Sequence, residues 1–328
     1  MNDVAREAGV ALKTVSRYVN GETNVNPELA KRIADAIRTL GYRRNLAAAS
    51  LRPGQTSRVL GLVIGDIANP FYAALTGAVE RGAQARDHML ITASSEESGV
   101  RHDKIVVRLL GQQVDGLIVV PPREVGASWD DLNPYNVPVV FVDRPASARS
   151  SDTVLADNFG GAYAATTQLI DEGCRRIAFL GDNLDIFTMS ERLRGFTEAL
   201  AARSLTVAPE LVISNIHSAG DGVREVAALL DPAVGVDGIF AANNRAALGS
   251  LRAFSSTKRR LPLIGFDDFE AAQLGEPPVS VVTQDIIGMG TSAVSMLFER
   301  IENPDLEART VVHPTQLVLR GSERVQSS

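Results

Sequence analysis

Val4-Ala5-Arg6-Glu7-Ala8-Gly9-Val10, followed by Thr14-Val15-Ser16-Arg17, decides the fold of the first part of this chain. The spacing predicts one helix, a tight turn at Gly9, where glycine tolerates a positive φ, and a second helix over residues 12–19. We expect Asp3 to cap the first helix. The predicted core between the two helices consists of Val4, Ala8, Val10, Val15 and Val19, with the small Ala5 where they cross. This arrangement is a helix-turn-helix.

The exposed face of the second predicted helix is polar. Lys13, Ser16 and Arg17 lie opposite the core, and in a helix-turn-helix that face enters the major groove of DNA. A third helix is predicted from the N-cap residue Asn26 to Gly41, where glycine ends it. The alternative interpretation of residues 1–44 is a small helical bundle with no DNA-binding role.

The segment Asn45-Leu46-Ala47-Ala48-Ala49-Ser50-Leu51-Arg52 has the composition of a helix of about two turns. An isolated helix of that length is unstable in water. The segment is therefore interpreted either as a short hinge helix or as a plain interdomain linker, and Pro53-Gly54 marks its end.

The composition is that of a globular protein with more than one domain. The 328 residues are 45% hydrophobic and 22% charged, and this length suggests two or three domains. No apolar run reaches the roughly 18 residues that span a bilayer, and no signal peptide precedes Asn2. Cys174 is the single cysteine. We therefore expect a cytoplasmic protein with no membrane span and no intrachain disulfide.

Charge is distributed unevenly along the chain. Residues 1–58 carry ten Lys or Arg and five Asp or Glu, whereas the remainder carries 23 basic and 34 acidic side chains. A basic end on an acidic body suits contact with phosphate groups. Chance alone can give the same asymmetry, so the charge supports the DNA-binding interpretation without establishing it.

Many motifs along almost the whole chain resemble the LacI/GalR family of bacterial transcription regulators. The matching residues are Asp3-Val4-Ala5, Ala8-Gly9-Val10, Thr14-Val15-Ser16-Arg17, Asn20-Gly21, Leu40-Gly41-Tyr42, Asn45, Gly61-Leu62-Val63, Asn69-Pro70-Phe71, Val114-Asp115-Gly116, Val142-Asp143-Arg144-Pro145, Ala156-Asp157-Asn158 and Gly265-Phe266-Asp267-Asp268. The resemblance implies a regulator, not an enzyme. It favours a repressor whose affinity for its operator is switched by a small-molecule effector.

The resemblance assigns base readout to three positions of the second helix. Leu12, Lys13 and Arg17 match positions that face base edges, and Arg17 suits a bidentate contact to guanine. Thr14 and Ser16 carry short hydroxyls that suit phosphate contacts.

The resemblance adds further DNA contacts at Asn20, Tyr42 and Asn45. In the family, two hinge helices pair in the minor groove, where Ala48 would let them approach and Leu51 would wedge open a base step. The implied partner is a double-stranded, pseudo-palindromic operator that is bound by a homodimer.

The chain departs from the family pattern at a few positions. Ala11 stands where a serine usually caps the recognition helix, and the loss of such a cap costs about 1 kcal/mol. In the hinge, Arg44, Ala47 and Ala49 replace the usual Pro, Val and Arg. The chain also begins a few residues later than the pattern, in a stretch that touches phosphate in the family. Either the start codon is misassigned, or we expect this domain to bind DNA more weakly than most.

From residue 59 onward, strand-like apolar runs alternate with helical patterns. The predicted strands are Val59–Ile64, His88–Ala93, Gly116–Val120, Val137–Val142, Arg176–Leu180, Leu211–Ser214, Gly238–Ala241 and Leu263–Phe266, and Asn69 is expected to cap a helix over Pro70–Arg86. Strands that are apolar on both faces and separated by helices predict parallel sheets that are covered on both sides. The predicted fold class is therefore α/β, with two doubly wound lobes behind a small all-α domain.

The resemblance implies a periplasmic-binding-protein-like core with three crossings between its lobes, near residues 155, 284 and 313. The expected domains are a helix-turn-helix at 1–44, a hinge helix and linker at 45–58, a first lobe of 59–155 with 285–312, and a second lobe of 156–284 with 313–328.

Polar residues follow the carboxyl ends of several predicted strands, which is where ligands bind in such sheets. These candidate effector-binding residues are Asp66, Asn69, Phe71, Asp143, Arg192, Asn243 and Asp267, with Arg192 expected to open a helix. By resemblance, Arg192, Asn243 and Asp267 hold the effector. A guanidinium fork, an amide and a carboxylate suit a polyhydroxy ligand, and Phe71, Tyr72 or Trp129 could stack on its ring.

The resemblance favours a sugar or sugar derivative as effector. The sequence leaves open which effector binds, whether it releases or promotes DNA binding, and which operator is read. The tail over residues 321–328 has no heptad pattern, so we expect a dimer and no tetramer formed by a coiled coil.

Two other functions are compatible with parts of the sequence. Gly288-Met289-Gly290-Thr291-Ser292-Ala293 matches a loose dinucleotide-binding pattern, but it lacks the βαβ setting of such sites, and small residues that allow close helix packing explain it equally well. A solute-binding protein of a transport system would fit the core but not residues 1–52. His88, His102, His217 and His313 are too scattered for a metal site, and no cofactor is expected.

Overall fold

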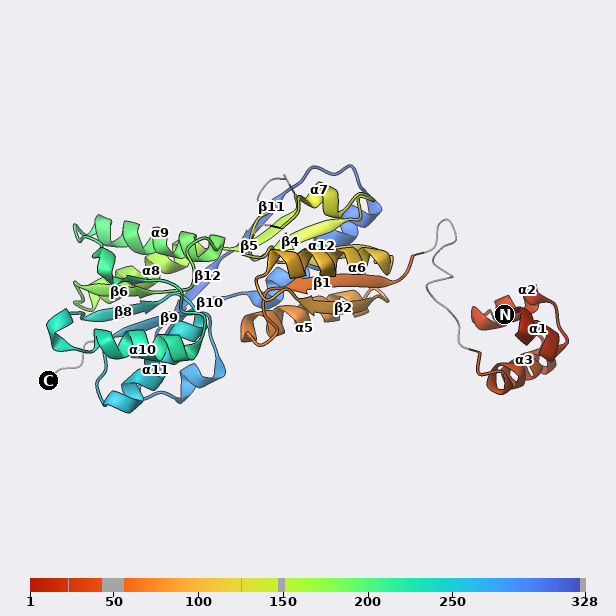
Figure 1. Cartoon of the computed structure of the whole chain (residues 1–328), viewed down its shortest axis with the longest axis horizontal. Coiled ribbons are helices and arrows are strands. Elements are labelled where there is room, and N and C mark those ends of the chain that lie inside the picture. Colours follow the sequence, from red (N-terminus) through yellow and green to blue (C-terminus); the bar gives the residue numbers. More distant parts are fainter. Residues whose placement is uncertain (23, 43–55, 125, 147–150, 325–328) are drawn as a thin grey trace. The chain divides into compact units, whose positions relative to one another are not determined.

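The structure is a computed structural model that describes residues 1–22, 24–42, 56–124, 126–146 and 151–324. It divides into two compact units, Met1–Ser57 and Arg58–Ser328, which Figure 1 draws along one chain. The predicted hinge helix, with Asn45, Ala48 and Leu51, lies outside the described residues.

The described part of the first unit holds three helices around one small core. They are α1 (Asn2–Ala8), α2 (Leu12–Val19) and α3 (Pro27–Thr39). Gly9 adopts a φ of 59° and ends α1, as predicted. The core buries Val4, Ala5, Ala8, Val15, Ile33 and Ala36, with Val10 and Val19 packed against it. These contacts confirm the predicted helix-turn-helix.

The caps of these helices agree only in part with the predictions. The Asn26 side chain accepts a hydrogen bond from the Glu28 amide and caps α3, as expected. The prediction that Asp3 caps α1 was wrong, because the helix already begins at Asn2. Asp3 instead lies in the first turn, where its carboxylate pairs with Arg6 at 2.6 Å.

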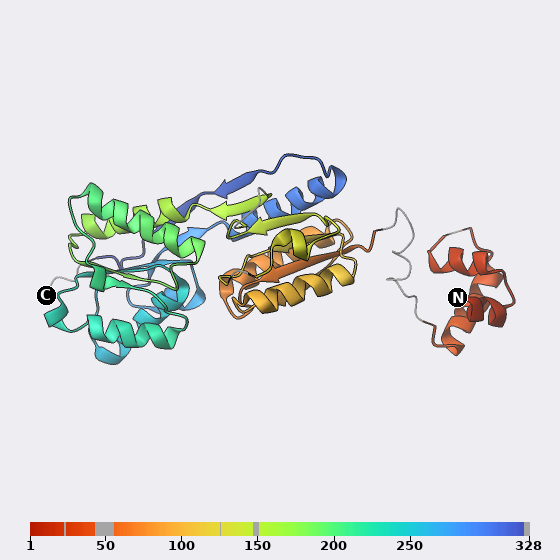
Figure 2. The same cartoon turned by 45° about the horizontal axis from the view of Figure 1, so that its top comes forward.

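The first lobe of the second unit is a parallel sheet that is covered on both faces (Figures 1 and 2). Its described strands follow the order β11-β5-β4-β3-β1-β2. The core on one face contains residues of α5 and α12, and the core on the other contains residues of α6 and α7. The elements are β1 (Val59–Ile64), α5 (Pro70–Gln84), β2 (Met89–Ser94), α6 (Gly99–Gly111), β3 (Gly116–Val119), α7 (Trp129–Leu132), β4 (Val139–Val142), β5 (Thr153–Ala156), α12 (Ile286–Glu302) and β11 (Thr310–His313).

The second lobe repeats this architecture with one difference. Its described strands follow the order β12-β10-β9-β8-β6-β7, and β12 runs antiparallel to β10 whereas the other pairs are parallel. The elements are α8 (Asn158–Asp171), β6 (Ile177–Leu180), α9 (Phe187–Ala202), η1 (Pro209–Leu211), β7 (Val212–Ile213), α10 (Ala219–Leu229), η2 (Pro232–Val234), β8 (Gly238–Ala241), α11 (Asn244–Thr257), β9 (Leu263–Phe266), η3 (Glu270–Leu274), β10 (Ser280–Gln284) and β12 (Thr315–Val318).

The predicted strands are confirmed as elements, and several of their ends shift. The run predicted over His88–Ala93 forms β2 one residue later, and the run predicted over Val137–Val142 begins at Val139. Asn69 caps α5 through the Phe71 amide, as expected. The strands β5, β11 and β12 were not predicted. The strands β11 and β12 are only partly buried and lack a continuous apolar run, and the apolar run in β5 spans only Val154–Ala156.

The chain passes between the lobes at three places. β5 leads through Asp157 into α8, β10 leads through Asp285 into α12, and β11 leads through residue 314 into β12. In each lobe the strand order reverses beside the first strand, and the carboxyl ends of parallel strands at such a point form a natural ligand site.

Two close helix contacts depend on glycine. A Cβ on Gly195 of α9 would lie 2.3 Å from the Phe159 carbonyl oxygen of α8. A Cβ on Gly290 of α12 would lie 2.6 Å from the Ala78 Cβ of α5. The glycine-rich run at 288–293 therefore allows close packing of α12 on α5. This is the packing interpretation of the run, as opposed to the dinucleotide-binding one.

Within the described residues, no helix is long and apolar enough to cross a membrane. The same part of the chain shows no group of His, Cys, Asp and Glu side chains suited to a metal ion. Cys174 is a buried free thiol, and burial raises its pKa to about 12.

Candidate functional site

The α2 face of the first unit presents the residues predicted to read DNA. Val15 is fully buried and anchors the helix, whereas the Leu12 side chain is 45% exposed. Lys13, Arg17 and Asn20 are exposed, and Thr14 and Ser16 are half-buried. The structure therefore places the predicted base-reading and phosphate-contacting side chains on one accessible surface. Tyr42 differs, because its ring also packs against the small core.

Two details of this surface bear on DNA binding. The Arg17 Nε lies 3.6 Å from the Glu22 carboxylate, with both side chains nearly half exposed, so the pair is weak and water competes for it. Ala11 occupies the N-cap of α2 and makes no side-chain cap bond. The recognition helix therefore has no capping side-chain oxygen, as the sequence predicted.

The second unit gathers all seven candidate effector residues around one pocket. Asp66, Asn69, Phe71 and Asp143 come from the first lobe, and Arg192, Asn243 and Asp267 come from the second. Most follow the carboxyl ends of β1, β4, β8 or β9, and the pocket encloses about 90 Å³. Ligand sites in doubly wound sheets form at this edge.

Arg192 is held rigidly in this pocket. It is 3% exposed, its Nε donates to the Asn158 side-chain oxygen at 2.8 Å, and one terminal nitrogen donates to the Ala242 carbonyl at 2.6 Å. Its guanidinium lies 3.6 Å from the centre of the Phe266 ring. Burial lowers the pKa of Arg192, and the negative charges of Asp267 and Asp143, which favour a higher pKa, offset this effect only in part. The other terminal nitrogen makes no hydrogen bond to a described residue and can donate to a ligand.

The expectation that Arg192 opens a helix was wrong. α9 begins at Phe187, so Arg192 lies in its second turn. The run Phe187-Thr188-Met189 lacks a good capping residue ahead of it, and Ile186 takes the cap position without a side-chain bond. Without a capping signal in the sequence, the start of the helix was placed too late.

Asp143 and Asp267 supply two carboxylates to the pocket. Both adopt φ values near 70° immediately after a strand, which is uncommon for residues other than glycine and frequent at functional sites. Burial raises the pKa of Asp143. Asp267 lies 3.8 Å from Arg192 and accepts a hydrogen bond from the Gln284 side-chain amide. These oxygens can accept hydrogen bonds from ligand hydroxyl groups.

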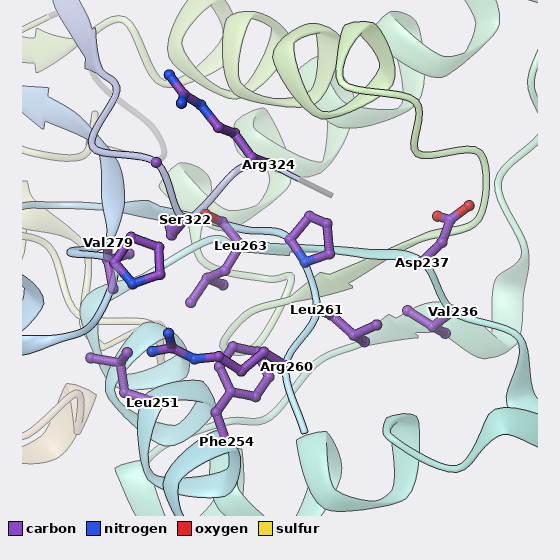
Figure 3. A pocket seen from close by; sticks show the side chains of 13 residues that line it. Val236, Asp237, Leu251, Phe254, Arg260, Leu261, Leu263, Val279, Ser322 and Arg324 are labelled. Carbon is purple, nitrogen blue, oxygen red and sulfur yellow. Dashed lines mark hydrogen bonds between the residues drawn. The ribbon is translucent and has the colours of Figure 1, made fainter. Parts of the chain in front are cut away.

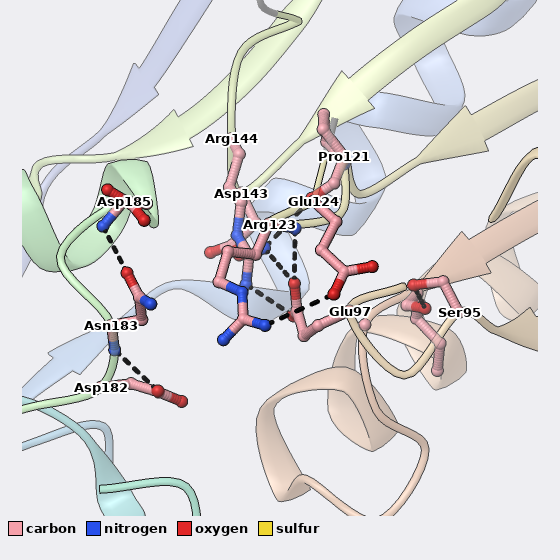
Figure 4. A network of polar contacts seen from close by, with 12 residues as sticks. Ser95, Glu97, Pro121, Arg123, Glu124, Asp143, Arg144, Asp182, Asn183 and Asp185 are labelled. Carbon is pink, nitrogen blue, oxygen red and sulfur yellow. Dashed lines mark hydrogen bonds and ion pairs between the residues drawn. The ribbon is translucent and has the colours of Figure 1, made fainter. Parts of the chain in front are cut away.

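A polar network fixes the first-lobe wall of the pocket (Figure 4). The Arg144 terminal nitrogens donate to both Glu97 carboxylate oxygens at 2.7 and 2.9 Å, and one also donates to the Tyr72 hydroxyl at 3.2 Å. Tyr72 in turn donates to Asp143 at 3.2 Å. Burial alone would raise the pKa of Glu97, but its hydrogen bonds and charge contacts with Arg144 outweigh burial and lower that pKa.

Two contacts join the lobes directly at the pocket rim. The Asn244 side-chain nitrogen donates to the Asn69 side-chain oxygen at 2.8 Å, and Arg245 pairs with Asp66. Asn243 caps α11 through its side-chain oxygen, which accepts from the Ala246 amide at 2.7 Å. Its side-chain nitrogen makes no hydrogen bond to a described residue and can donate to a ligand.

Sequence reasoning missed some of the pocket lining. Gln284 ends β10 and Asp182 lies two residues after the end of β6, at the same edge, so the rule of strand ends could have identified them. Tyr72 was considered a stacking residue but acts as a hydrogen-bonding member of the Arg144 network. Phe71 lines the pocket and belongs largely to the first-lobe core, where it is 6% exposed.

A separate apolar pocket of about 260 Å³ lies in the second lobe, with Leu251, Phe254 and Leu261 among its lining residues (Figure 3). It sits where β8, β9 and β10 begin, at the edge opposite the Arg192 pocket. Because parallel sheets bind ligands at the carboxyl ends of their strands, this pocket is not the candidate site.

The geometry defines a class of protein: a helix-turn-helix unit on the same chain as a two-lobed core with a polar ligand pocket between its lobes. Residues 1–45 match the model of bacterial regulatory proteins of the lacI family, and residues 166–323 match that of the periplasmic binding protein-like domain. The chain belongs to the LacI family of transcriptional regulators.

Known relatives match along the whole chain. The chain is 34% identical to the HTH-type transcriptional regulator CelR of Thermobifida fusca, over 97% of this chain and 96% of that protein. It is 29% identical to the ribose operon repressor of Haemophilus influenzae, over 98% of each. A solved structure of a CelR–cellobiose complex superposes with a TM-score of 0.72 at 32% identity, over 98% of each chain.

Family membership decides between the functions considered above. The protein is a DNA-binding regulator with an effector-binding core, and its relatives are regulators and not enzymes. Neither the nucleotide-dependent enzyme nor the solute-binding protein of a transport system is retained.

Proposed function

We propose that the protein is a repressor that binds a pseudo-palindromic operator as a homodimer, and that a sugar in the Arg192 pocket switches its DNA affinity. One observation carries the proposal: a buried guanidinium, an amide and two carboxylates converge on one pocket between the lobes. This mixture of donors and acceptors suits a polyhydroxy ligand. The cellobiose bound by the related CelR supports a sugar.

In this proposal each side chain has a defined task. The free part of the Arg192 fork and the Asn243 side-chain nitrogen donate to sugar oxygens. Asp143 and Asp267 accept from sugar hydroxyls, and charge-assisted bonds of this kind are about twice as strong as neutral ones. The contacts of Arg192 with Asn158 and Ala242 keep the fork in place before the ligand arrives, which reduces the entropy lost on binding.

The DNA-binding part of the proposal rests on α2. Leu12, Lys13 and Arg17 would face base edges, and Thr14 and Ser16 would contact phosphates. Asn20 and Tyr42 flank this surface. The hinge residues proposed for the minor groove, Asn45, Ala48 and Leu51, lie outside the described residues.

The switch needs a ligand whose affinity differs between two arrangements of the lobes. The pocket walls come from both lobes, and the rim contacts Asn69–Asn244 and Asp66–Arg245 cross between them. A ligand that bridges the lobes therefore favours the closed arrangement. This coupling supports the control of DNA affinity by the effector, since the two binding events are linked reciprocally.

Thermal unfolding of the full chain against a panel of mono- and disaccharides tests the effector site. A ligand at 100 times its dissociation constant adds about 2.7 kcal/mol of stability. We expect Asp267→Asn to abolish most of this gain, because the amide replaces an acceptor oxygen with a donor. The matched control is Asp268→Asn, which weakens the pair with Arg320, keeps an oxygen that can accept from the Phe269 amide, lies outside the pocket lining and should keep the gain. Equal gains in both variants would refute the assignment.

A further inference from the structure

A second cavity adjoins the Arg192 pocket. It encloses about 420 Å³ and lies between the first lobe and the start of α9. Arg144 and Ile186 line both cavities, so the two share a wall. The Arg192 pocket, with about 90 Å³, falls below the ~300–1,000 Å³ usual for ligand sites, whereas the second cavity falls within that range. We call the second cavity the Trp129 chamber, after the aromatic residue among its lining.

The Trp129 chamber combines apolar surfaces with a few polar groups. Its apolar lining includes Trp129, Phe141, Phe187 and two consecutive prolines at 121 and 122. The Trp129 ring meets Phe141 edge-on at 5.2 Å between centres, which fixes its plane. Aromatic surface next to sparse polar groups suits the apolar face and the hydroxyl rim of a sugar ring.

Three buried polar atoms of lining residues have no hydrogen-bond partner among the described residues: His102 Nε2, Trp129 Nε1 and Arg144 Nε. Buried polar atoms are nearly always hydrogen-bonded, and an exception points to a bound water or ligand. His102 is 5% exposed, and its Nδ1 lies 3.0 Å from the Asp103 carboxylate. In the neutral imidazole this contact places the proton on Nδ1 and leaves Nε2 as an acceptor.

Trp129 Nε1 and His102 Nε2 are complementary to hydroxyl groups. The indole N–H of Trp129 only donates, His102 Nε2 accepts when Nδ1 carries the proton, and a sugar hydroxyl both donates and accepts. Asp103 keeps this wall in place, since its second oxygen accepts from the Ala127 amide at 2.7 Å. A Cβ on the neighbouring Gly126 would lie 2.4 Å from Asp103, so the loop approaches the carboxylate closely.

We propose that the effector is a saccharide of at least two rings, with one ring in the Arg192 pocket and the next in the Trp129 chamber. This inference rests on the proposed sugar effector and extends it to the size of the ligand and to a second subsite. In that subsite Trp129 packs against the ring and donates to one of its oxygens, and His102 accepts from a hydroxyl. Arg144, held by Glu97, forms the partition between the two rings.

The chain offers a direct reporter, because Trp129 is the single tryptophan. The full chain is titrated with disaccharides, including cellobiose, maltose and lactose, and separately with their component monosaccharides. Calorimetry measures binding and tryptophan emission measures occupancy of the chamber. We expect at least one disaccharide to bind ten times or more tighter than its monosaccharides and to shift the emission.

Trp129→Phe keeps an aromatic ring against Phe141 but removes the N–H. The loss of one hydrogen bond should weaken disaccharide binding by about tenfold and change monosaccharide binding by less than about twofold. Tyr135→Phe is the control, since that side chain is 82% exposed and outside the chamber, and it should bind as the unchanged protein does.

The outcomes separate this inference from the proposed function. Calorimetric binding of a sugar with no change in tryptophan emission, or undiminished disaccharide binding by Trp129→Phe, would overturn the two-ring inference and leave the sugar effector standing. The absence of binding by every sugar would overturn the sugar effector, and the inference with it.

Discussion

Ala11 shows how a single residue changes the stability of the DNA-reading surface. It occupies the N-cap of α2 with an extended backbone and no side-chain oxygen, so an amide of the first turn lacks a partner that serine would supply. We expect Ala11→Ser to stabilise α2 by about 1 kcal/mol. The measurement is hydrogen exchange of the α2 amides in the full chain, which should slow by about fivefold.

Asn26→Ala provides the reciprocal test, since Asn26 caps α3 through the Glu28 amide at 2.9 Å. In the Asn26→Ala variant, hydrogen exchange of the α3 amides should be faster by about the same factor as exchange of the α2 amides slows in Ala11→Ser. If Ala11→Ser left α2 exchange unchanged while Asn26→Ala accelerated α3, a cap at residue 11 would contribute nothing to this helix.

At the scale of single residues, the sequence predicted what depends on local chemistry. Asn26 and Asn69 cap helices as expected because an Asn before a helix-starting proline is a strong local signal. Asp3 did not cap α1, because one more residue joined the helix. Trp129 could not be placed from the sequence, since its position depends on packing against Phe141, which lies on a different element.

At the scale of elements, the Glu97–Arg144 pair joins the connection between β2 and α6 to the end of β4. Arg144 is 9% exposed and Glu97 is 26% exposed as side chains. Removal of one partner from such a pair leaves the other charge buried and costs ~3 kcal/mol. We therefore expect Glu97→Gln to lower the free energy of unfolding by about that amount at pH 7.

The same pair gives the protein a defined pH response. Because the pKa of Glu97 is lowered in the folded state, its stabilising effect is complete above its usual value of 4.5 and is lost as the pH falls through the lowered pKa. The difference in urea midpoint between the unchanged protein and Glu97→Gln should therefore narrow below about pH 4.5. A difference that stayed constant into that acid range would show that Glu97 does not act through its charge.

Elements were predictable where they were buried and periodic. β1, β8 and β9 have the predicted bounds because continuous apolar runs mark fully covered parallel strands. The half-exposed β11 and β12 lack such runs, and their pairing with β5 and β10 depends on contacts distant in sequence. The start of α9 was placed late for want of a capping residue.

At the scale of the whole molecule, the sequence motifs pointed to the family, and the rule of strand ends pointed to the pocket. All seven candidate effector residues line one cavity, because parallel strands bring their carboxyl ends, and the starts of the helices that follow them, to one edge. The Trp129 chamber was not predicted. It depends on how α6, the loop before α7 and the start of α9 pack together, and no local pattern encodes that packing.

The regulatory account depends on coupling between the pocket and the DNA-binding surface. Coupling free energies between sites are typically 1–3 kcal/mol, or about 5- to 150-fold in affinity. A sugar that bridges the lobes can alter operator affinity only by the difference between its affinities for the two states. Sugar binding alone is therefore not sufficient for the proposed function. The bound sugar must also change the affinity of the protein for its operator.

The most direct test is operator affinity measured with and without a bound sugar. The full chain first selects its site from random-sequence duplexes, and the dissociation constant of that site is then measured with and without a saturating sugar. We predict a pseudo-palindromic site, a change in affinity of about tenfold or more, and no such change in Asp267→Asn. A chain that selects no sequence, or whose operator affinity is the same with and without a sugar that demonstrably binds, would contradict the account.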